Sequence, residues 1–137
     1  MKKDFALPEV REVYIAAVLR PHPEDAAATE WWVYLINNLP HPIEHLIINS
    51  RGYSDLDQKK GQQTSTLRRR LPVVPAKSAV AIEPIMPEVF HLFNEYWVSF
   101  FEENAMKDRQ YIFGPHSIDA RFAEALPVLL DKGVLIR

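Results

Sequence analysis

Apolar residues in this chain occur in short runs separated by turn residues, and two of these runs are apolar on both faces of an extended strand. Residues 31–36 read Trp-Trp-Val-Tyr-Leu-Ile, and residues 93–101 combine aromatic and β-branched side chains with few polar ones. Successive side chains of a strand point to opposite faces, so each run needs cover on two sides. This pattern predicts a compact antiparallel β domain whose second aromatic face is covered by a helix, a second sheet or a partner.

Turn residues divide the apolar runs into about seven strands of similar spacing. Because proline, glycine or a polar turn ends each run, the strands are expected at residues 10–20, 31–37, 43–50, 64–71, 79–85, 90–101 and 109–113. Proline places the fifth strand at a sheet edge, and the last two are expected to pair across a hairpin loop at 102–108. Residues 24–30 are expected to be an alanine-rich, acidic connection. The spacing favours an antiparallel, immunoglobulin-like β-sandwich over a barrel.

The C-terminal part of the chain changes from a strand pattern to a helical one. Ser117 fits an N-cap, and Ile118, Phe122 and Leu126 follow at helical spacing before Pro127. Residues 117–137 are therefore expected to contain a short helix and then an apolar tail. The last four residues of this tail are expected to add to a sheet edge.

Length and composition support a single domain. The chain has 137 residues, of which 47% are apolar and 25% charged, with a net charge of -2, so one core is expected and no overall attraction to a polyanion. The absence of cysteine excludes disulfides, thiolate metal sites and a cysteine nucleophile. Residues 1–8 are charged and then broken by proline, which indicates a flexible N-terminus without a signal peptide. A cytoplasmic location and no membrane partner are expected.

Histidines and serines give no clear catalytic or metal site. His41 and His45 are four residues apart, but Pro42 makes the segment extended and places the two rings about 13 Å apart, too far to share an ion. No serine has the glycine-flanked turn of an activated nucleophile, and the four glycines form no phosphate loop. We therefore expect no catalytic residue, no metal and no cofactor, and no enzyme activity.

Three glutamates and one glycine turn each allow a functional interpretation as well as a structural one. Glu83, Glu95 and Glu102 could supply paired carboxylates for acid/base chemistry, but polar residues that alternate with aromatic ones are typical of any half-buried strand. The turn around Gly52 could hold an anion through its backbone, although glycine is the usual residue of a turn that ends a strand. The structural interpretation is favoured in each case.

A basic cluster is the most prominent polar feature of the surface. Its members are Lys59, Lys60, Arg68, Arg69 and Arg70, on a hairpin expected at residues 59–70. On a strand Arg68 and Arg70 share a face, and beside exposed aromatic rings they could hold single-stranded nucleic acid by charge and stacking. In the other interpretation the arginines pair with Asp55 and Asp57 or prevent strands of two molecules from pairing at their edges.

The aromatic strands favour contact with another protein. The expected interaction residues are Trp31, Trp32, Tyr96 and Trp97. Trp31 and Trp32 are adjacent in a strand, so they cannot both point into the core. Contiguous exposed aromatic surface is uncommon on monomers, which favours an interface. If the C-terminal helix instead packs over one sheet face through Phe122 and Leu126, that face is covered within the molecule and no interface follows.

Several strings of this chain resemble a small family of uncharacterised bacterial proteins, over about residues 31–114. They are Trp32-Val33-Tyr34-Leu35-Ile36-Asn37, Asn49-Ser50-Arg51-Gly52-Tyr53, Thr64-Ser65-Thr66-Leu67-Arg68, Val74-Pro75-Ala76-Lys77-Ser78, Glu83-Pro84-Ile85 and Asn94-Glu95-Tyr96-Trp97-Val98-Ser99. Members of that family sometimes carry the label phenylalanyl-transfer-RNA synthetase alpha subunit. The resemblance implies no catalytic residues. Residues 71–82 are also similar to a segment of immunoglobulin-like domains.

The sequence thus predicts a binding or assembly module without catalysis, which associates with itself or with another protein. Binding of single-stranded nucleic acid through the basic hairpin is the alternative.

Overall fold

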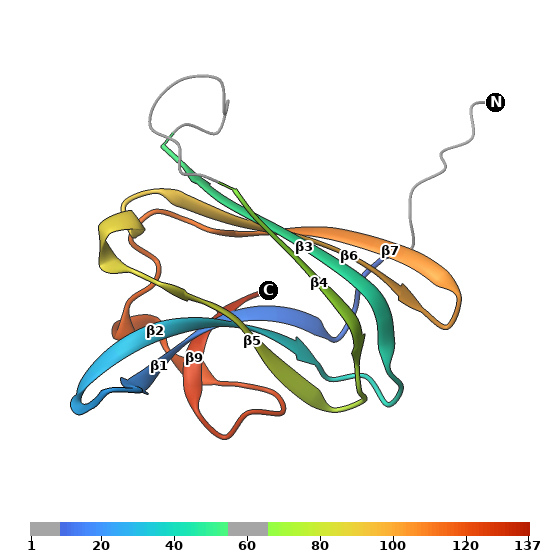
Figure 1. Cartoon of the computed structure of the whole chain (residues 1–137), viewed down its shortest axis with the longest axis horizontal. Coiled ribbons are helices and arrows are strands. Elements are labelled where there is room, and N and C mark those ends of the chain that lie inside the picture. Colours follow the sequence, from blue (N-terminus) through green and yellow to red (C-terminus); the bar gives the residue numbers. More distant parts are fainter. Residues whose placement is uncertain (1–8, 55–65) are drawn as a thin grey trace.

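The computed structural model describes residues 9–54 and 66–137, and in these ranges the chain forms two antiparallel β-sheets. Sheet A has the strand order β5-β2-β1-β9-β8, and sheet B has the order β4-β3-β6-β7. The two sheets lie one above the other in Figure 1. The strands are β1 (Val13–His22), β2 (Asp25–Asn37), β3 (Ile43–Tyr53), β4 (Leu67–Val74), β5 (Ser78–Ile85), β6 (Phe93–Glu102), β7 (Ala105–Phe113), β8 (Glu124–Ala125) and β9 (Lys132–Ile136).

The core lies between the two sheets. Alternate residues of β1 and β2, such as Ile15 and Leu35, meet alternate residues of β3 and β6, such as Ile48 and Val98, and all four side chains are buried. The hydroxyl of Tyr111 crosses the core and donates a hydrogen bond of 2.6 Å to the backbone carbonyl of Val13. The predicted mainly β, antiparallel fold is confirmed, and each predicted strand has a counterpart in the structure.

β2 and β7 begin well before their predicted N-terminal ends. Residues 24–30 were expected to be a connection, but β2 begins at Asp25 and pairs with β1 as far as a bulge between Pro21 and His22. This is sterically possible because β9 covers β1 only up to Val18, so Pro21 lies where β1 is an edge strand and needs no donor on that side. The expected loop at 102–108 is likewise mostly strand, because β6 and β7 are joined directly at Glu103 and Asn104.

The turn expected around Gly52 is wrong, because β3 continues to Tyr53 and Gly52 pairs with Asn94 of β6. Other strand predictions are confirmed. β6 and β7 form the expected hairpin, and β5 is an edge strand of sheet A. The C-terminal tail adds to sheet A as β9, although β8 then covers its outer side. Residues 1–8 and residues 55–65, which include Lys59 and Lys60, lie outside the described residues.

The predicted C-terminal helix is wrong. Residues 118–126 form a 3-10 turn, η2 (Ala120–Phe122), followed by β8. The Asp119 carboxylate accepts the backbone N–H of Arg121 at 2.9 Å, and Ala123 is already extended, so the turn does not continue. Pro127 leaves too few residues for a stable helix, and pairing of β8 with β9 satisfies the backbone instead. In the described ranges a second 3-10 turn, η1 (Pro87–Val89), follows β5, and no helix is long and apolar enough to cross a bilayer.

The C-terminal segment nevertheless covers the outer face of sheet A. Val18 points away from the core, yet it is fully buried, and it pairs with Gly133 of β9. A Cβ atom on Gly133 would lie 2.9 Å from the side chain of Leu126 and 3.1 Å from that of Val18. Leu126 therefore packs on this outer face, beside Gly133 and Val18.

Replacement of Gly133 by alanine is expected to destabilise the protein by about 1–3 kcal/mol, the usual cost of overpacking. The new Cβ would meet the Ala17 carbonyl oxygen at 2.6 Å, and a backbone atom in a paired strand cannot move away. Gly114→Ala is the matched control, because nothing lies within 4 Å of its Cβ position. Urea unfolding compares the stabilities of the two variants. Equal stabilities would contradict this close packing around Gly133.

Candidate functional site

The outer face of sheet B carries a row of side chains that the strand register brings together. Arg68 of β4 is opposite Asn49 of β3, Asn49 is opposite Trp97 of β6, and Trp97 is opposite Gln110 of β7. Side chains of directly paired residues lie on the same face of a sheet. This face points away from the core, because the neighbouring residues Tyr96 and Val98 point into it. A predicted aromatic residue and a predicted arginine thus share one surface.

Trp97 leans over the β6–β7 pair. Its indole N–H donates a hydrogen bond to the Asp108 carboxylate, which also accepts one from Ser99 at 3.1 Å. The ring is 40% exposed. Further along the same face, Phe101 and Met106 are paired with each other and are 39% and 46% exposed. We call Trp97, Phe101 and Met106 the apolar strip.

A buried carboxylate, that of Glu95, lies near Trp97 on the same face of β6. Glu95 is only 4% exposed although it lies on the outer face, and it accepts hydrogen bonds from Gln110 at 2.6 Å and from Tyr53 at 3.2 Å. The Arg51 guanidinium completes the arrangement at 3.4 Å from Glu95, above the Tyr53 ring. These contacts link the side chains of β3, β6 and β7 on the face that carries the exposed Trp97 ring. Beside it, a shallow hollow of about 270 Å³ is lined by Trp97, Asn49 and Thr66, among others.

The basic cluster is divided between two faces. Arg68 and Arg70 are exposed on the outer face of sheet B, and neither forms an ion pair with any residue that the structure describes. Arg69 points inward and donates hydrogen bonds to the backbone carbonyls of Ala81 and Ile82 in β5, so it joins the edge strands of the two sheets. Only two of the three predicted arginines are therefore available for a ligand on this face.

The other predicted aromatic residues are not on this surface. Trp31 packs against the core, with its ring at 6.4 Å from that of Phe90 in an edge-to-face arrangement. Trp32, opposite Val18, lies half-buried on the outer face of sheet A, where its indole donates to Glu30 at 3.0 Å. Tyr96 is 2% exposed and belongs to the core. The structure thus leaves Trp97 as the exposed member of the predicted interaction set.

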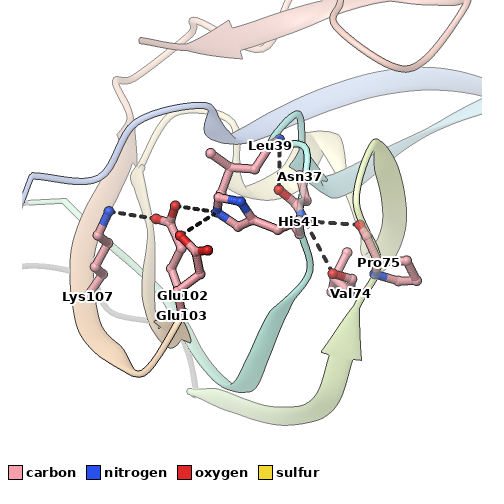
Figure 2. A network of polar contacts seen from close by, with 8 residues as sticks. All are labelled: Asn37, Leu39, His41, Val74, Pro75, Glu102, Glu103 and Lys107. Carbon is pink, nitrogen blue, oxygen red and sulfur yellow. Dashed lines mark hydrogen bonds and ion pairs between the residues drawn. The ribbon is translucent and has the colours of Figure 1, made fainter.

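A second polar group lies at the end of the sheets where β6 meets β7. His41 Nε2 is 2.5 Å from one oxygen of Glu102 and 3.7 Å from Glu103, and Lys107 donates to the other oxygen of Glu102 at 2.6 Å (Figure 2). Sequence reasoning missed this pair because 61 residues separate His41 from Glu102. The spacing of the histidines could therefore not predict that His41 pairs with Glu102.

The loop that carries His41 is held by a buried asparagine. The Asn37 side-chain amide donates to the backbone carbonyls of His41, Val74 and Pro75, and its oxygen accepts the N–H of Leu39 at 3.0 Å (Figure 2). The nitrogen and the oxygen of this fully buried amide thus both have partners, which fixes the loop against β4.

His41, Glu102 and Glu103 could hold a cation, since their ligand atoms lie within 4.8 Å of one another. Lys107 competes with any such ion, because its ammonium already neutralises Glu102. Burial acts to raise the pKa of Glu102, but the hydrogen bonds from Lys107 and His41 outweigh it, and the pKa lies below its ordinary value. The group therefore functions as a satisfied ion-pair network, and the prediction of no metal site stays a prediction.

Glu83 forms a third polar group, between the sheets. It lies on β5, and one of its carboxylate oxygens accepts hydrogen bonds from Tyr96 at 2.6 Å and from Ser50 at 3.1 Å, both in sheet B. Burial, and then the charge of Glu83, raise the pKa of Tyr96 well above its usual range, so its hydroxyl stays a donor. The Ser50 hydroxyl is engaged by a carboxylate and not by a histidine, which does not match an activated nucleophile.

Comparison with known proteins adds no relative. No protein-family model, curated protein or solved structure matches this chain. The resemblance to an uncharacterised bacterial family remains a prediction from the residues quoted above.

The lowered pKa of Glu102 predicts a contribution to stability that acid removes. The folded state holds this carboxylate ionised below its ordinary pKa of 4.5, so its contribution is present above that pH and is lost as the pH falls through the lower, folded pKa. Urea unfolding between about pH 5 and pH 3 should show a steeper loss for the native chain than for Glu102→Gln. Glu103→Gln, which removes a carboxylate 3.7 Å from His41, is the control. Parallel curves for the native chain and Glu102→Gln would contradict this assignment.

Proposed function

We propose that this chain is a non-catalytic module that associates with a second copy of itself through the outer face of sheet B. The observation that carries the proposal is the apolar strip, where Trp97, Phe101 and Met106 lie exposed on one face. Exposed aromatic and methionine side chains that adjoin one another are characteristic of interfaces. The outer face of sheet A is instead partly covered, because the C-terminal segment packs over Val18.

The edges of sheet B favour contact through the face over contact through a strand. β4 carries three arginines and Pro72, and β7 at the opposite edge carries Lys107 and Arg109. Charged residues and proline on edge strands prevent the pairing of strands between molecules. A partner is therefore expected to lie flat on the sheet.

The charges of this face are complementary to their own copy. Arg68 and Arg70 lie on β4 at one side of the face, and Asp108 lies on β7 at the other. A two-fold axis parallel to the strands would place β4 of one molecule over β7 of the other, so that Arg70 approaches Asp108 twice. Such an arrangement buries the apolar strip at its centre and supports a symmetric dimer.

We further propose that the two sheets form an immunoglobulin-like sandwich. β2 pairs with β5 in sheet A and β3 pairs with β6 in sheet B, so the connections from β2 to β3 and from β5 to β6 both change sheet. This arrangement matches the Greek-key order of immunoglobulin-like domains. Many cell-surface and binding domains use this architecture, which is consistent with a binding role by analogy.

The variant Trp97→Ser, Phe101→Ser tests self-association. The native chain is expected to elute as a dimer in size-exclusion chromatography with light scattering, and the variant as a folded monomer, because the loss of two aromatic side chains removes the centre of the interface. Leu130→Ser is the control, since Leu130 is fully exposed on the C-terminal segment and its loss should leave the mass unchanged. A native monomer, or a folded variant of dimeric mass, would exclude this interface.

Single-stranded nucleic acid is a second candidate for the same face. The observation in its favour is that Arg68, without an ion pair in the described ranges, lies in one row with the exposed ring of Trp97. Bases stack on such rings and arginines contact the phosphates. Asp108 and Glu44 on the same face oppose a polyanion, which places this function second.

Arg68→Glu with Arg70→Glu distinguishes the two functions. If nucleic acid binds here, the logarithm of the affinity for a labelled oligothymidine falls with the logarithm of salt concentration, and the double variant lowers that slope by about 0.7 per arginine. Arg121→Glu is the control, because Arg121 lies on the C-terminal segment and pairs with Asp119. Absence of binding at low salt, with a 260/280 nm absorbance ratio typical of protein, would leave self-association as the function.

A further inference from the structure

A cavity of about 380 Å³ opens between the two sheets on the side where β4 and β5 are the edge strands. Its polar wall includes Ser50, Arg51, Glu83 and Tyr96, and its apolar wall includes Leu67, Ile85 and Met86. A volume of this size is typical of sites for small ligands. The cavity lies between the sheets, so it is separate from the apolar strip on the outer face of sheet B.

Local strand geometry places Glu83 in this cavity. β5 contains a bulge opposite Val33 and Tyr34 of β2, so Glu83 as well as Ile82 faces the space between the sheets. The same bulge turns two successive carbonyls, those of Ala81 and Ile82, toward Arg69. Arg69 thus joins β4 to β5, and it is not among the residues that line the cavity.

Among the residues that the structure describes, no cationic side chain pairs with Glu83. Its two hydrogen-bond donors, Ser50 and Tyr96, are neutral hydroxyls and both reach the same oxygen, Oε2. In the part of the chain that the structure describes, Oε1 has no hydrogen-bond partner and is reached by solvent. The nearby arginines are engaged elsewhere, since Arg69 binds backbone carbonyls and Arg51 pairs with Glu95.

The chemistry of the walls determines the class of ligand. A half-buried carboxylate without a counter-ion gains most from a cationic hydrogen-bond donor, because hydrogen bonds between charged groups are about twice as strong as neutral ones. The apolar wall beside it accommodates methylene groups. We propose that this cavity binds a primary ammonium group carried on a short alkyl chain, with the ammonium at Oε1 of Glu83.

Two sources supply this chemistry. One is a free small amine, and the other is the lysine side chain of a partner protein, whose four methylenes end in the same group. Titration of the native chain with n-pentylamine and with Nα-acetyl-lysine N-methylamide separates them. Tighter binding of the lysine derivative identifies a side chain of a partner, and tighter binding of n-pentylamine identifies a free amine.

Isothermal titration calorimetry with n-pentylamine tests the proposal. Binding in the millimolar range is expected, with n-pentanol and n-pentanoate at least about tenfold weaker because they lack the charge that Glu83 requires. Glu83→Gln should weaken n-pentylamine at least about tenfold. Glu88→Gln is the matched control, since Glu88 is an exposed glutamate of η1 outside the cavity wall.

A variant at Met86 distinguishes loss of ligand binding from loss of folding. Met86 is 45% exposed at the rim of the cavity, so Met86→Lys should fold and present its own ammonium to Glu83. It is expected to compete with n-pentylamine and weaken it, whereas Met86→Gln is expected to bind as the native chain does. Equal binding of n-pentylamine and n-pentanol, an unchanged affinity in folded Glu83→Gln, or no binding up to about 10 mM would each overturn the proposal.

Discussion

The central constraint on this fold is that β2 and β6, which lie inside their sheets, carry large apolar side chains on both faces. Packing of the two sheets covers only the inner faces, with residues such as Leu35 and Val98. The chain satisfies the constraint on one side only, because the C-terminal segment places Leu126 over the outer face of sheet A. Nothing in the described residues covers the outer face of sheet B in the same way, and Trp97 and Phe101 remain about two-fifths exposed. The proposed interface follows from this difference between the sheets.

Polar contacts fix the edges that the apolar core does not reach. On the side of β4 and β5, Arg69 joins the two sheets through backbone carbonyls and Glu83 joins them through the hydroxyl of Tyr96. At the β6–β7 turn, Glu102 lies between His41 and Lys107. Each buried charge in these groups has hydrogen-bond partners, as the cost of burying an unpaired polar group requires. Glu83 differs from the other groups, since its donors in the described ranges, Ser50 and Tyr96, are neutral, and the proposed ligand would add a cation.

Local patterns in the sequence predicted the strands but not the contacts between them. Period-two alternation and proline positions located β3, β5 and the β6–β7 hairpin, because these signals act over a few residues. The helical spacing of Ile118, Phe122 and Leu126 was misleading, since pairing of β8 with β9 depends on residues outside that window. The outer-face row of Arg68, Asn49 and Trp97 required the register of three strands, and the pair of His41 with Glu102 required a contact across 61 residues. Composition and spacing carry no information about either.

Met106 and Met86 are similarly exposed, and their oxidation tests most directly whether the outer face of sheet B is an interface. Met106 belongs to the apolar strip and is 46% exposed, whereas Met86 lies at the end of β5 and is 45% exposed. Peroxide oxidation of the native chain, followed by peptide mass spectrometry across a range of protein concentrations, compares their accessibility. If the outer face of sheet B forms the interface, the two rates are similar in dilute solution, and Met106 alone slows as the concentration rises. Equal rates for Met106 and Met86 at every concentration would contradict the account.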